Sequence, residues 1–291
     1  MKIRDWPATV GLNESYRRIR ELGLECNLSE LDAFGFTVIE DAAPTELVEQ
    51  LKTAIVATTA SHEKVSLEVI DGKASLQGMK YQNHLLIKDR AFEEALMLSK
   101  PLTLVKYLAG ESCIFSTMGS HLRGDGGNEL PLHADIGGWL PQPFPLCPMF
   151  VNYTLALTDY SKEAGALAVV PGSHKKCRSP EAGENSVENN ELAVPVEVPA
   201  GSAIVWHGNL WHGGYIRQIP GFRINLAMVF LRAGLMPQEN YTGLIPQETF
   251  DRNNETFAQL LGRDVAWNFG EEGPDYNKLA KQASSTRNWF T

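Results

Sequence analysis

The 291-residue sequence is 43% hydrophobic and carries a formal net charge of −9. That apolar content excludes an intrinsically disordered chain, and the acidic balance without a clustered basic face argues against nucleic-acid binding. Four widely spaced cysteines, no apolar signal core after Met1 and no bilayer-length apolar run predict a cytoplasmic protein without disulfides or membrane contact.

The first third of the chain favours helices, with one early strand. The predicted elements are helices at 14–24, at 29–33, from Pro44 onward and at 91–108, and a strand at 35–40. Pro44 suits a helix start, and the apolar residues that follow it recur at helical spacing, which predicts one buried face. We expect residues 28–110 to form a helical support for the rest of the fold.

Beyond Cys113 the pattern changes to short β-like runs separated by Gly, Pro and Asn. The predicted strands are 113–118, 130–136, 150–157, 166–170, 194–198, 202–206 and 223–231. Many short strands with turn signals between them are typical of a sandwich or barrel. We therefore expect an all-β core at 111–235 with flanking helices. Residues 236–291 are predicted to form a helical extension, with a helix at 248–261, that covers the barrel mouth or mediates self-association into a homo-oligomer.

One pair of residues within the predicted strand 130–136 indicates metal chemistry. His133 and Asp135 are two positions apart, and alternation along a strand places such side chains on one face. An imidazole nitrogen and a carboxylate oxygen then reach one ion, and a distant histidine is the natural third ligand. Two histidines and one carboxylate, with three coordination positions open, form the facial triad of non-heme Fe(II) oxygenases. Alone, the pair fits a surface loop or a buried histidine equally well.

Two residues near the end of the β-rich region support the metal interpretation. His212 supplies a distant imidazole, and Arg223 begins the apolar strand that follows it. A planar guanidinium binds a carboxylate with two hydrogen bonds, as a dicarboxylate co-substrate requires. The alternative for Arg223 is a surface ion pair. Its apolar strand favours burial, and a buried guanidinium requires a partner.

Four segments resemble, in order, motifs of the phytanoyl-CoA dioxygenase family of Fe(II)/2-oxoglutarate oxygenases. They are Leu132–Asp135, Gly165–His174, Trp206–Gly208 leading to His212, and Arg223. Residues 34–39 also resemble the usual opening strand, and the whole resemblance covers residues 28–235. It implies a double-stranded β-helix (a cupin-like jelly roll), which we expect to occupy one domain at 1–291. It also implies Fe(II), 2-oxoglutarate and dioxygen as cofactor and co-substrates.

The resemblance implies that His133, Asp135 and His212 are the iron ligands. Related halogenases replace the carboxylate with a small residue, so Asp135 favours oxygenation over halogenation. His207 competes with His212 for the third place. The family pattern sets the distal histidine eleven positions before the arginine, which fits His212 and Arg223. His207 is then structural or lies behind the ligands.

The resemblance further implies co-substrate contacts, each with a plainer alternative. Arg223 binds the far carboxylate of 2-oxoglutarate, and Thr154 and Asn152 line its pocket unless they are ordinary buried hydrogen bonders. Lys80 resembles a co-substrate lysine, against the alternative of a solvated lysine. Gly214 departs from the family, which often places a hydroxyl residue there.

Trp139 follows the predicted metal strand and either lines an apolar substrate pocket or packs at its rim. The family implies hydroxylation of an unactivated C–H bond in a small-molecule metabolite, with 2-oxoglutarate converted to succinate. Desaturation, epoxidation or rearrangement at the same iron, a non-catalytic metal- or sugar-binding jelly roll, and a zinc hydrolase are the alternatives. No basic cluster is placed for a CoA phosphate, which favours a smaller or more apolar substrate.

Overall fold

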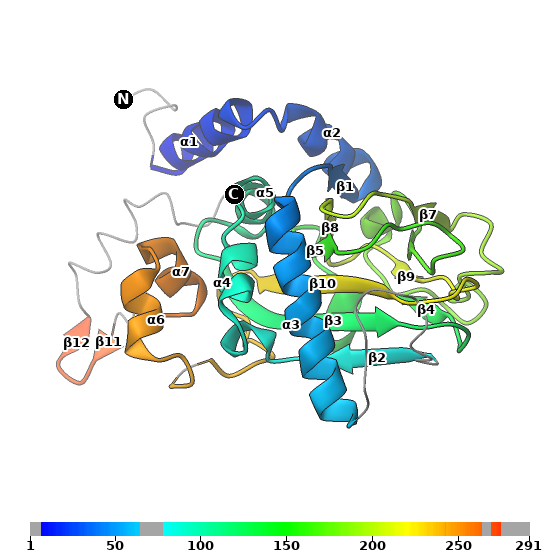
Figure 1. Ribbon diagram of the computed structural model, residues 1–291. Coiled ribbons are helices and arrows are strands. Elements are labelled where there is room, and N and C mark those ends of the chain that lie inside the picture. The colour runs from blue at the N-terminus through cyan, green and yellow to red at the C-terminus, as the bar shows by residue number, and fades with distance from the viewer. Residues whose placement is uncertain (1–6, 65–77, 242, 264–268, 275–291) are drawn as a thin grey trace.

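The computed structural model describes residues 7–64, 78–241, 243–263 and 269–274 (Figure 1). The helices are α1 (Pro7–Glu21), α2 (Glu25–Phe34), α3 (Thr45–Glu63), α4 (Arg90–Leu96), α5 (Ser99–Ala109), α6 (Gln247–Arg252) and α7 (Glu255–Leu260), with short 3-10 turns η2 (Leu85–Ile87), η3 (Asp135–Gly138) and η4 (Ser173–Lys176). The strands are β1 (Phe36–Ile39), β2 (Met79–Gln82), β3 (Ile114–Arg123), β4 (Leu130–His133), β5 (Phe150–Ala156), β6 (Leu167–Val169), β7 (Val194–Val196), β8 (Ala203–His207), β9 (His212–Gly214), β10 (Arg223–Leu231), β11 (Phe269–Gly270) and β12 (Gly273–Pro274).

Two antiparallel sheets make up the β core. The six-stranded sheet has the order β1-β8-β5-β10-β3-β2, and the four-stranded sheet has the order β4-β9-β6-β7. Phe150 and Leu231 of the larger sheet pack with Leu132 and Ala168 of the smaller one, so the sheets face each other. Their inner faces enclose a shared interior, which confirms the predicted double-stranded β-helix.

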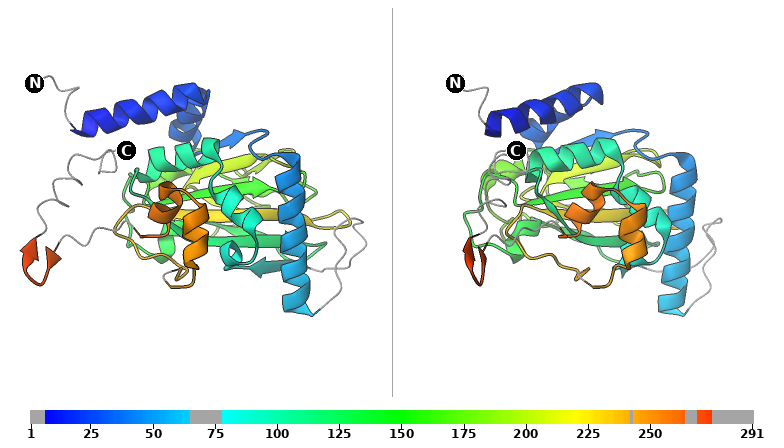
Figure 2. Two further views of the ribbon diagram at one scale, coloured as in Figure 1. Left: turned by 60° about the vertical axis from the view of Figure 1, so that its left-hand side comes forward. Right: turned by 90° about the vertical axis from the view of Figure 1, so that its left-hand side faces the viewer.

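Helices cover the outer face of the six-stranded sheet. Figures 1 and 2 show α3, α4 and α5 lying across it, with α6 and α7 beside them. Alternate residues of β10, including Leu226 and Phe230, join Leu51 of α3 and Phe257 of α7 in one apolar cluster. Burial of this apolar surface stabilises the assembly at roughly 25 cal/mol per Å². The intervening β10 side chains, such as Arg223, therefore face the interior between the sheets.

Local chemistry explains where the first helices end. α2 stops at Gly35, which has φ +83°, a left-handed conformation that favours glycine. A Cβ there would lie 2.4 Å from Nδ1 of His174, so the position also has no room for a side chain. The chain then enters β1, as predicted. Pro44 lies directly before α3, and Leu47 and Leu51 are buried on the face expected from their spacing.

The helical predictions were right in type but differ in their bounds. The helices predicted at 14–24 and 29–33 are longer in the structure, as α1 and α2, whereas two other predicted helices were too long. The predicted helix at 91–108 is divided into α4 and α5, and that at 248–261 into α6 and α7. The strands β2 and β9 were not predicted, because each is short and carries little apolar alternation. Residues Trp289 and Phe290, which end the predicted extension, lie outside the described residues. None of the described helices is both long and apolar enough to span a membrane.

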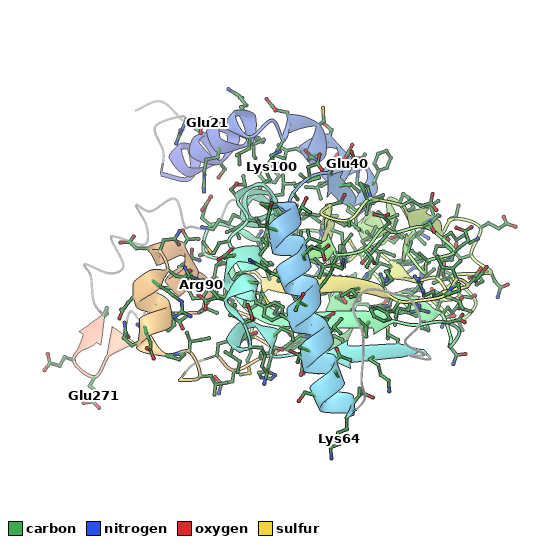
Figure 3. All side chains as sticks on the ribbon, in the orientation of Figure 1. Glu21, Glu40, Lys64, Arg90, Lys100 and Glu271 are labelled. Atoms are coloured by element: carbon green, nitrogen blue, oxygen red, sulfur yellow. The ribbon has the colours of Figure 1, made fainter. Side chains whose placement is uncertain are left out.

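Charged side chains lie at the periphery, away from this double layer. Glu21, Lys64, Arg90 and Glu271, among those labelled in Figure 3, are all exposed. The charged groups that are buried are therefore the exceptions that require a partner or a function.

Candidate metal centre

His133 and Asp135 lie close together, but not on one strand as predicted. β4 ends at His133, and Asp135 begins the 3-10 turn η3. The strand stops there because Ile136 N donates to Gly208 O at 3.4 Å and Gly137 N to Ala134 O at 3.0 Å, which turns the backbone away from the sheet. The turn still leaves His133 Nε2 only 3.5 Å from Asp135 Oδ1.

His212 completes the cluster from β9, the strand next to β4. His133 and His212 are register partners, and their ring centroids are 4.3 Å apart. His212 Nε2 lies 3.5 Å from Asp135 Oδ2. One donor atom from each of the three residues lies within 4.8 Å of the others, a spacing that can hold a metal ion. The predicted convergence of these side chains is therefore present in the fold.

Backbone carbonyls orient both imidazole rings. His133 Nδ1 lies 2.8 Å from Pro131 O, and His212 Nδ1 lies 3.0 Å from Leu210 O. A carbonyl oxygen only accepts hydrogen bonds, so Nδ1 carries the hydrogen in each ring. Nε2 of each ring then keeps its lone pair and faces Asp135. This arrangement is the one that metal-binding histidines adopt.

Asp135 is held as an anion by its neighbours. Burial raises its pKa, but in acid the charge of protonated His212, the hydrogen bond from protonated His133 and the amide of Asn152 together lower the pKa to about 2. Burial lowers the pKa of His212 to about 4, with Asp135 opposing the shift. At neutral pH these two groups are therefore a carboxylate and a neutral imidazole, the forms that bind metals.

Among the described residues, the cluster is more exposed at His133 than at His212. The His133 side chain is 42% exposed, whereas that of His212 is 7% exposed. Trp139, directly after η3, is 40% exposed, and its ring centroid lies 5.6 Å from that of Phe150 on the inner face of β5. A small molecule would reach the cluster from the His133 side, past apolar rings.

Arg223 is buried in the interior between the sheets. The residue is 6% exposed, and its guanidinium carbon lies 4.7 Å from the centroid of the Tyr160 ring. Within the described part of the chain it forms no ion pair, and its Nε has no hydrogen-bond partner. The predicted alternative, a surface ion pair, is therefore wrong. A buried guanidinium in this state lacks the anion that would compensate its charge.

Thr154 and Asn152 share the inner face of β5, as predicted. Asn152 Nδ2 donates to Asp135 Oδ2 at 2.6 Å, so its contact in this structure is with the cluster rather than with Arg223. Thr154 Oγ1 donates to Leu226 O and accepts from Asn225 Nδ2, each at 3.2 Å. The structure thus places one residue behind the carboxylate and the other further along the interior.

Lys80 is not brought to the cluster. Its register partner on β3 is Leu122, which belongs to the apolar cluster under the helices, so Lys80 points to the outer face. Its Nζ lies 2.6 Å from Glu63 Oε2 at the end of α3. The prediction of a co-substrate contact fails here because alternation along β2 directs this side chain away from the interior.

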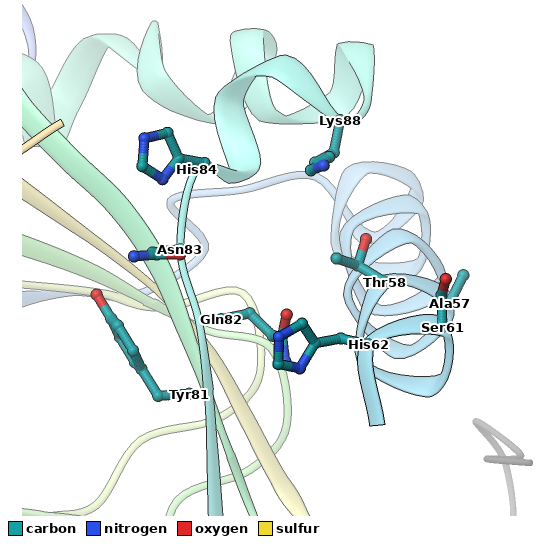
Figure 4. A pocket seen from close by; sticks show the side chains of 9 residues that line it. All are labelled: Ala57, Thr58, Ser61, His62, Tyr81, Gln82, Asn83, His84 and Lys88. Carbon is teal, nitrogen blue, oxygen red and sulfur yellow. The ribbon is translucent and has the colours of Figure 1, made fainter. Parts of the chain in front are cut away.

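A cleft of about 590 Å³ lies between α3 and β2. Figure 4 shows His62 and Thr58 of α3 on one side of it and the segment of Gln82 and His84 on the other. None of the three residues of the metal cluster lines this cleft, so it is a separate surface feature.

His207 is distinguished from His212 by its hydrogen bonds. His207 Nε2 donates to Leu146 O at 3.1 Å, and Nδ1 accepts from Asn209 N at 3.0 Å. Both ring nitrogens are therefore occupied by the backbone, and the residue is not among the grouped metal donors. Its position in the structure is that of a structural histidine.

Three further polar residues of the interior were not identified from the sequence. They are His121 and Arg123 on β3 and Tyr160 after β5. Burial and the charge of Arg223 lower the pKa of His121 to about 3, so this ring is neutral. The available signal was the alternation of polar and apolar residues along 114–123, which places these β3 side chains opposite the buried Met118 and Leu122.

Comparison with known proteins gives this geometry a context. The chain is 26% identical over 226 residues to dioxygenase af480 of Aspergillus fumigatus, covering 77% of this chain and 71% of that protein. Its fold is similar to that of HygX from Streptomyces hygroscopicus, solved with nickel and 2-oxoglutarate bound. The TM-score is 0.59, the sequence identity is 18%, and the match covers 73% of this chain and 88% of the HygX chain. It is also similar to SnoN, a non-heme alpha-ketoglutarate-dependent epimerase from nogalamycin biosynthesis. Here the TM-score is 0.56, the sequence identity is 18%, and the match covers 79% of this chain and 91% of the SnoN chain.

The family model for phytanoyl-CoA dioxygenase (PhyH) matches residues 31–218. That segment is more than half of the chain, and it contains all three residues of the metal cluster. The described geometry, the curated relative and the fold agree with this match. The chain therefore belongs to the phytanoyl-CoA dioxygenase (PhyH) family and is an Fe(II)- and 2-oxoglutarate-dependent dioxygenase.

Proposed function

We propose that this dioxygenase hydroxylates an unactivated C–H bond of a small-molecule metabolite while 2-oxoglutarate is converted to succinate. The proposal is based on one spatial relationship, between the metal cluster and Arg223. Three metal-binding donor atoms lie within 4.8 Å of one another at the open end of an interior that also buries Arg223 without an anion. A dicarboxylic 2-oxo acid has one end that can reach the metal ion and, at the other end, a carboxylate that can pair with Arg223.

His133, Asp135 and His212 hold the iron in this proposal. Two neutral imidazoles and one carboxylate fit Fe(II), and three protein ligands leave positions for other molecules. When bound, Fe(II) with 2-oxoglutarate and dioxygen supplies the oxidising chemistry. The chain contributes orientation: Pro131 O and Leu210 O hold the two rings, and Asn152 holds the carboxylate.

Arg223 binds the far carboxylate of 2-oxoglutarate. Its charge is unpaired within the described residues, and the ring of Tyr160 holds one face of the guanidinium. A bidentate contact with a carboxylate would satisfy the donors that the protein leaves free. Thr154 lines the same interior, whereas Asn152 acts through Asp135. Lys80 is not part of the proposed pocket, because it pairs with Glu63 on the other face of the sheet.

Trp139 contacts the substrate at the open side of the cluster. Its exposed ring stands against Phe150, which places an apolar wall next to the entrance. One basic group, Arg178, is already engaged, since its Nη1 and Nη2 bind the two oxygens of Glu184 at 2.6 and 3.0 Å. These contacts favour a small, largely apolar substrate over one that carries a polyphosphate.

The first test is anaerobic addition of Fe(II) and then 2-oxoglutarate to the purified protein. We expect the weak visible charge-transfer band that such centres show, and its absence would contradict the proposed centre. A zinc hydrolase or a non-catalytic jelly roll predicts no band and no succinate. A metabolite screen with succinate release as readout then finds the substrate. Product analysis separates hydroxylation from desaturation, epoxidation or rearrangement, any of which would overturn the C–H hydroxylation assignment.

A further inference from the structure

Two buried arginines face each other in the interior. Arg123 at the end of β3 and Arg223 at the start of β10 are register partners, so their side chains leave the same face of the sheet. Arg123 is 2% exposed and Arg223 is 6% exposed. Burial, followed by the charge of Arg223, lowers the pKa of Arg123 to about 10, so Arg123 remains cationic at neutral pH. Two adjacent buried cations are unfavourable unless an anion joins them.

The protein itself provides no such anion among the described residues. Arg123 Nη2 donates to Asn128 O at 2.6 Å, and Nη1 lies 3.8 Å from Met79 Sδ. Its Nε has no partner, and neither does Nε of Arg223. Neither guanidinium forms an ion pair with a described carboxylate. The contacts that exist are to neutral atoms, which leaves two positive charges uncompensated.

The Arg123 guanidinium lies next to β9, the strand that carries His212. Gly214 lies two positions after His212 on β9, so a side chain there would share the face of that histidine. A Cβ built on Gly214 would lie 3.6 Å from Arg123 Nη1. A Cβ on Gly165 would lie 3.1 Å from Arg123 Cδ and 3.2 Å from Nε. Gly165 thus leaves space that a Cβ would narrow, whereas a Cβ on Gly214 would make only ordinary contact with the Arg123 guanidinium.

We propose that Arg123 is a second binding residue for the distal carboxylate of 2-oxoglutarate and acts together with Arg223. The proposal rests on the proposed function, and it adds a cation from β3 at the position that Gly214 leaves without a side chain. The carboxylate lies between the two guanidinium groups and joins strands β3 and β10. In the absence of this anion the pair of cations repel each other.

The test separates 2-oxoglutarate binding from iron binding. Arg123→Met and wild type are compared anaerobically, first for Fe(II) affinity and then for 2-oxoglutarate affinity of the Fe(II)-loaded protein by the charge-transfer band. We expect Fe(II) affinity to change by less than about twofold, because Arg123 touches none of the three ligands. Affinity for 2-oxoglutarate should fall about 10- to 100-fold, as expected for the loss of a hydrogen-bonded buried charge.

Arg217→Met is the matched control. In this neighbouring buried arginine each of the three guanidinium nitrogens donates to a backbone carbonyl oxygen, those of Gly221, Ala164 and Pro220, so the protein already holds the whole group. It should leave 2-oxoglutarate affinity unchanged in the folded protein. Arg123→Lys keeps the charge and should restore part of the lost affinity, which also provides a result if Arg123→Met does not fold.

The outcomes distinguish the two proposals. A wild-type protein that binds Fe(II) but never 2-oxoglutarate overturns the proposed function. If wild type binds both and Arg123→Met matches its 2-oxoglutarate affinity, only the inference fails. An equal loss of Fe(II) and 2-oxoglutarate affinity shows that Arg123 merely supports the strands, which also rejects the inference. If only Arg123→Lys folds, an unchanged 2-oxoglutarate affinity rejects it.

Discussion

Asn152 donates a hydrogen bond from Nδ2 to Oδ2 of Asp135 at 2.6 Å. The contact joins the inner face of β5 to the first residue of η3, two elements that belong to opposite walls of the fold. It leaves the carboxylate facing His133 and His212 rather than free to rotate. Asp135 does not lie on a regular strand, and this amide supplies the restraint that a strand would otherwise provide.

Loss of this amide should weaken metal binding. We expect Asn152→Ala to lower Fe(II) affinity about 10- to 100-fold, the usual cost of removing a hydrogen bond behind a metal ligand. Anaerobic Fe(II) titration measures the effect. Asn225→Ala is the control, because Asn225 is also a buried interior amide but bonds His121 N and Thr154 Oγ1. Equal affinities for Asn152→Ala and wild type would remove Asn152 from the centre.

Substitution of His207, which ends β8, or of His212, which begins β9, separates the two candidates for the third ligand. His212→Gln should abolish the Fe(II)/2-oxoglutarate absorption band, because apart from His133 no other described histidine offers Nε2 to Asp135. His207→Gln should keep the band, since both nitrogens of His207 are bonded to the backbone. Anaerobic absorption spectra of the two variants provide the measurement. The reverse pattern would assign the ligand to His207.

Arg223→Met should prevent effective use of 2-oxoglutarate while iron still binds. The variant removes the guanidinium that lies over the Tyr160 ring but leaves all three side chains of the metal cluster in place. We expect affinity for 2-oxoglutarate to fall about 100-fold or more, because two charge-assisted hydrogen bonds are lost. Titration of the Fe(II)-loaded protein measures it. Retained wild-type affinity would show that another group holds the far carboxylate.

The stability of the metal-free protein should fall in acid partly through His207. Burial lowers the pKa of this histidine to about 4, and the nearby ring of His174, 5.4 Å away between centroids, opposes its charging. The unfolded chain binds the proton near pH 6.5, so falling pH favours unfolding from there down to about pH 4. This one group removes up to about 3 kcal/mol across that range.

Urea unfolding of wild type and His207→Gln at about pH 7 and about pH 4.5 measures this contribution. The variant is expected to be less stable at the higher pH, because it loses the bonds to Leu146 O and Asn209 N. Its further loss between the two pH values should be smaller than that of wild type by about 2 kcal/mol. An identical pH dependence would assign the acid sensitivity to other groups.

The segment after β10 is attached to β3 by one buried carboxylate. Glu239 accepts hydrogen bonds from His84 N at 2.7 Å, from Met118 N at 3.1 Å and from the hydroxyl of Tyr241. Glu239→Ala should therefore lower the free energy of unfolding by about 3 kcal/mol, since it leaves buried donors unpaired. Chemical denaturation measures the change, with the exposed Glu248→Ala as control. Equal stability of both variants would contradict this role.

The sequence alone was sufficient for the family, the jelly roll and the convergence of His133, Asp135 and His212. Short alternating strands determine which side chains share a face, and an ordered set of motifs identifies the remote histidine. Regular elements with strong local patterns, such as β10 at 223–231, were predicted with the boundaries that the structure has.

Only the tertiary structure decided contacts that depend on which strands become neighbours. It placed Asp135 on a turn held by Asn152, turned Lys80 toward Glu63, and set Arg123 opposite Arg223. These pairs are separated by 17 to 100 residues, so local propensity carries no information about them. Pairing and register of the strands determine them, because a shift by one residue would send each side chain to the opposite face.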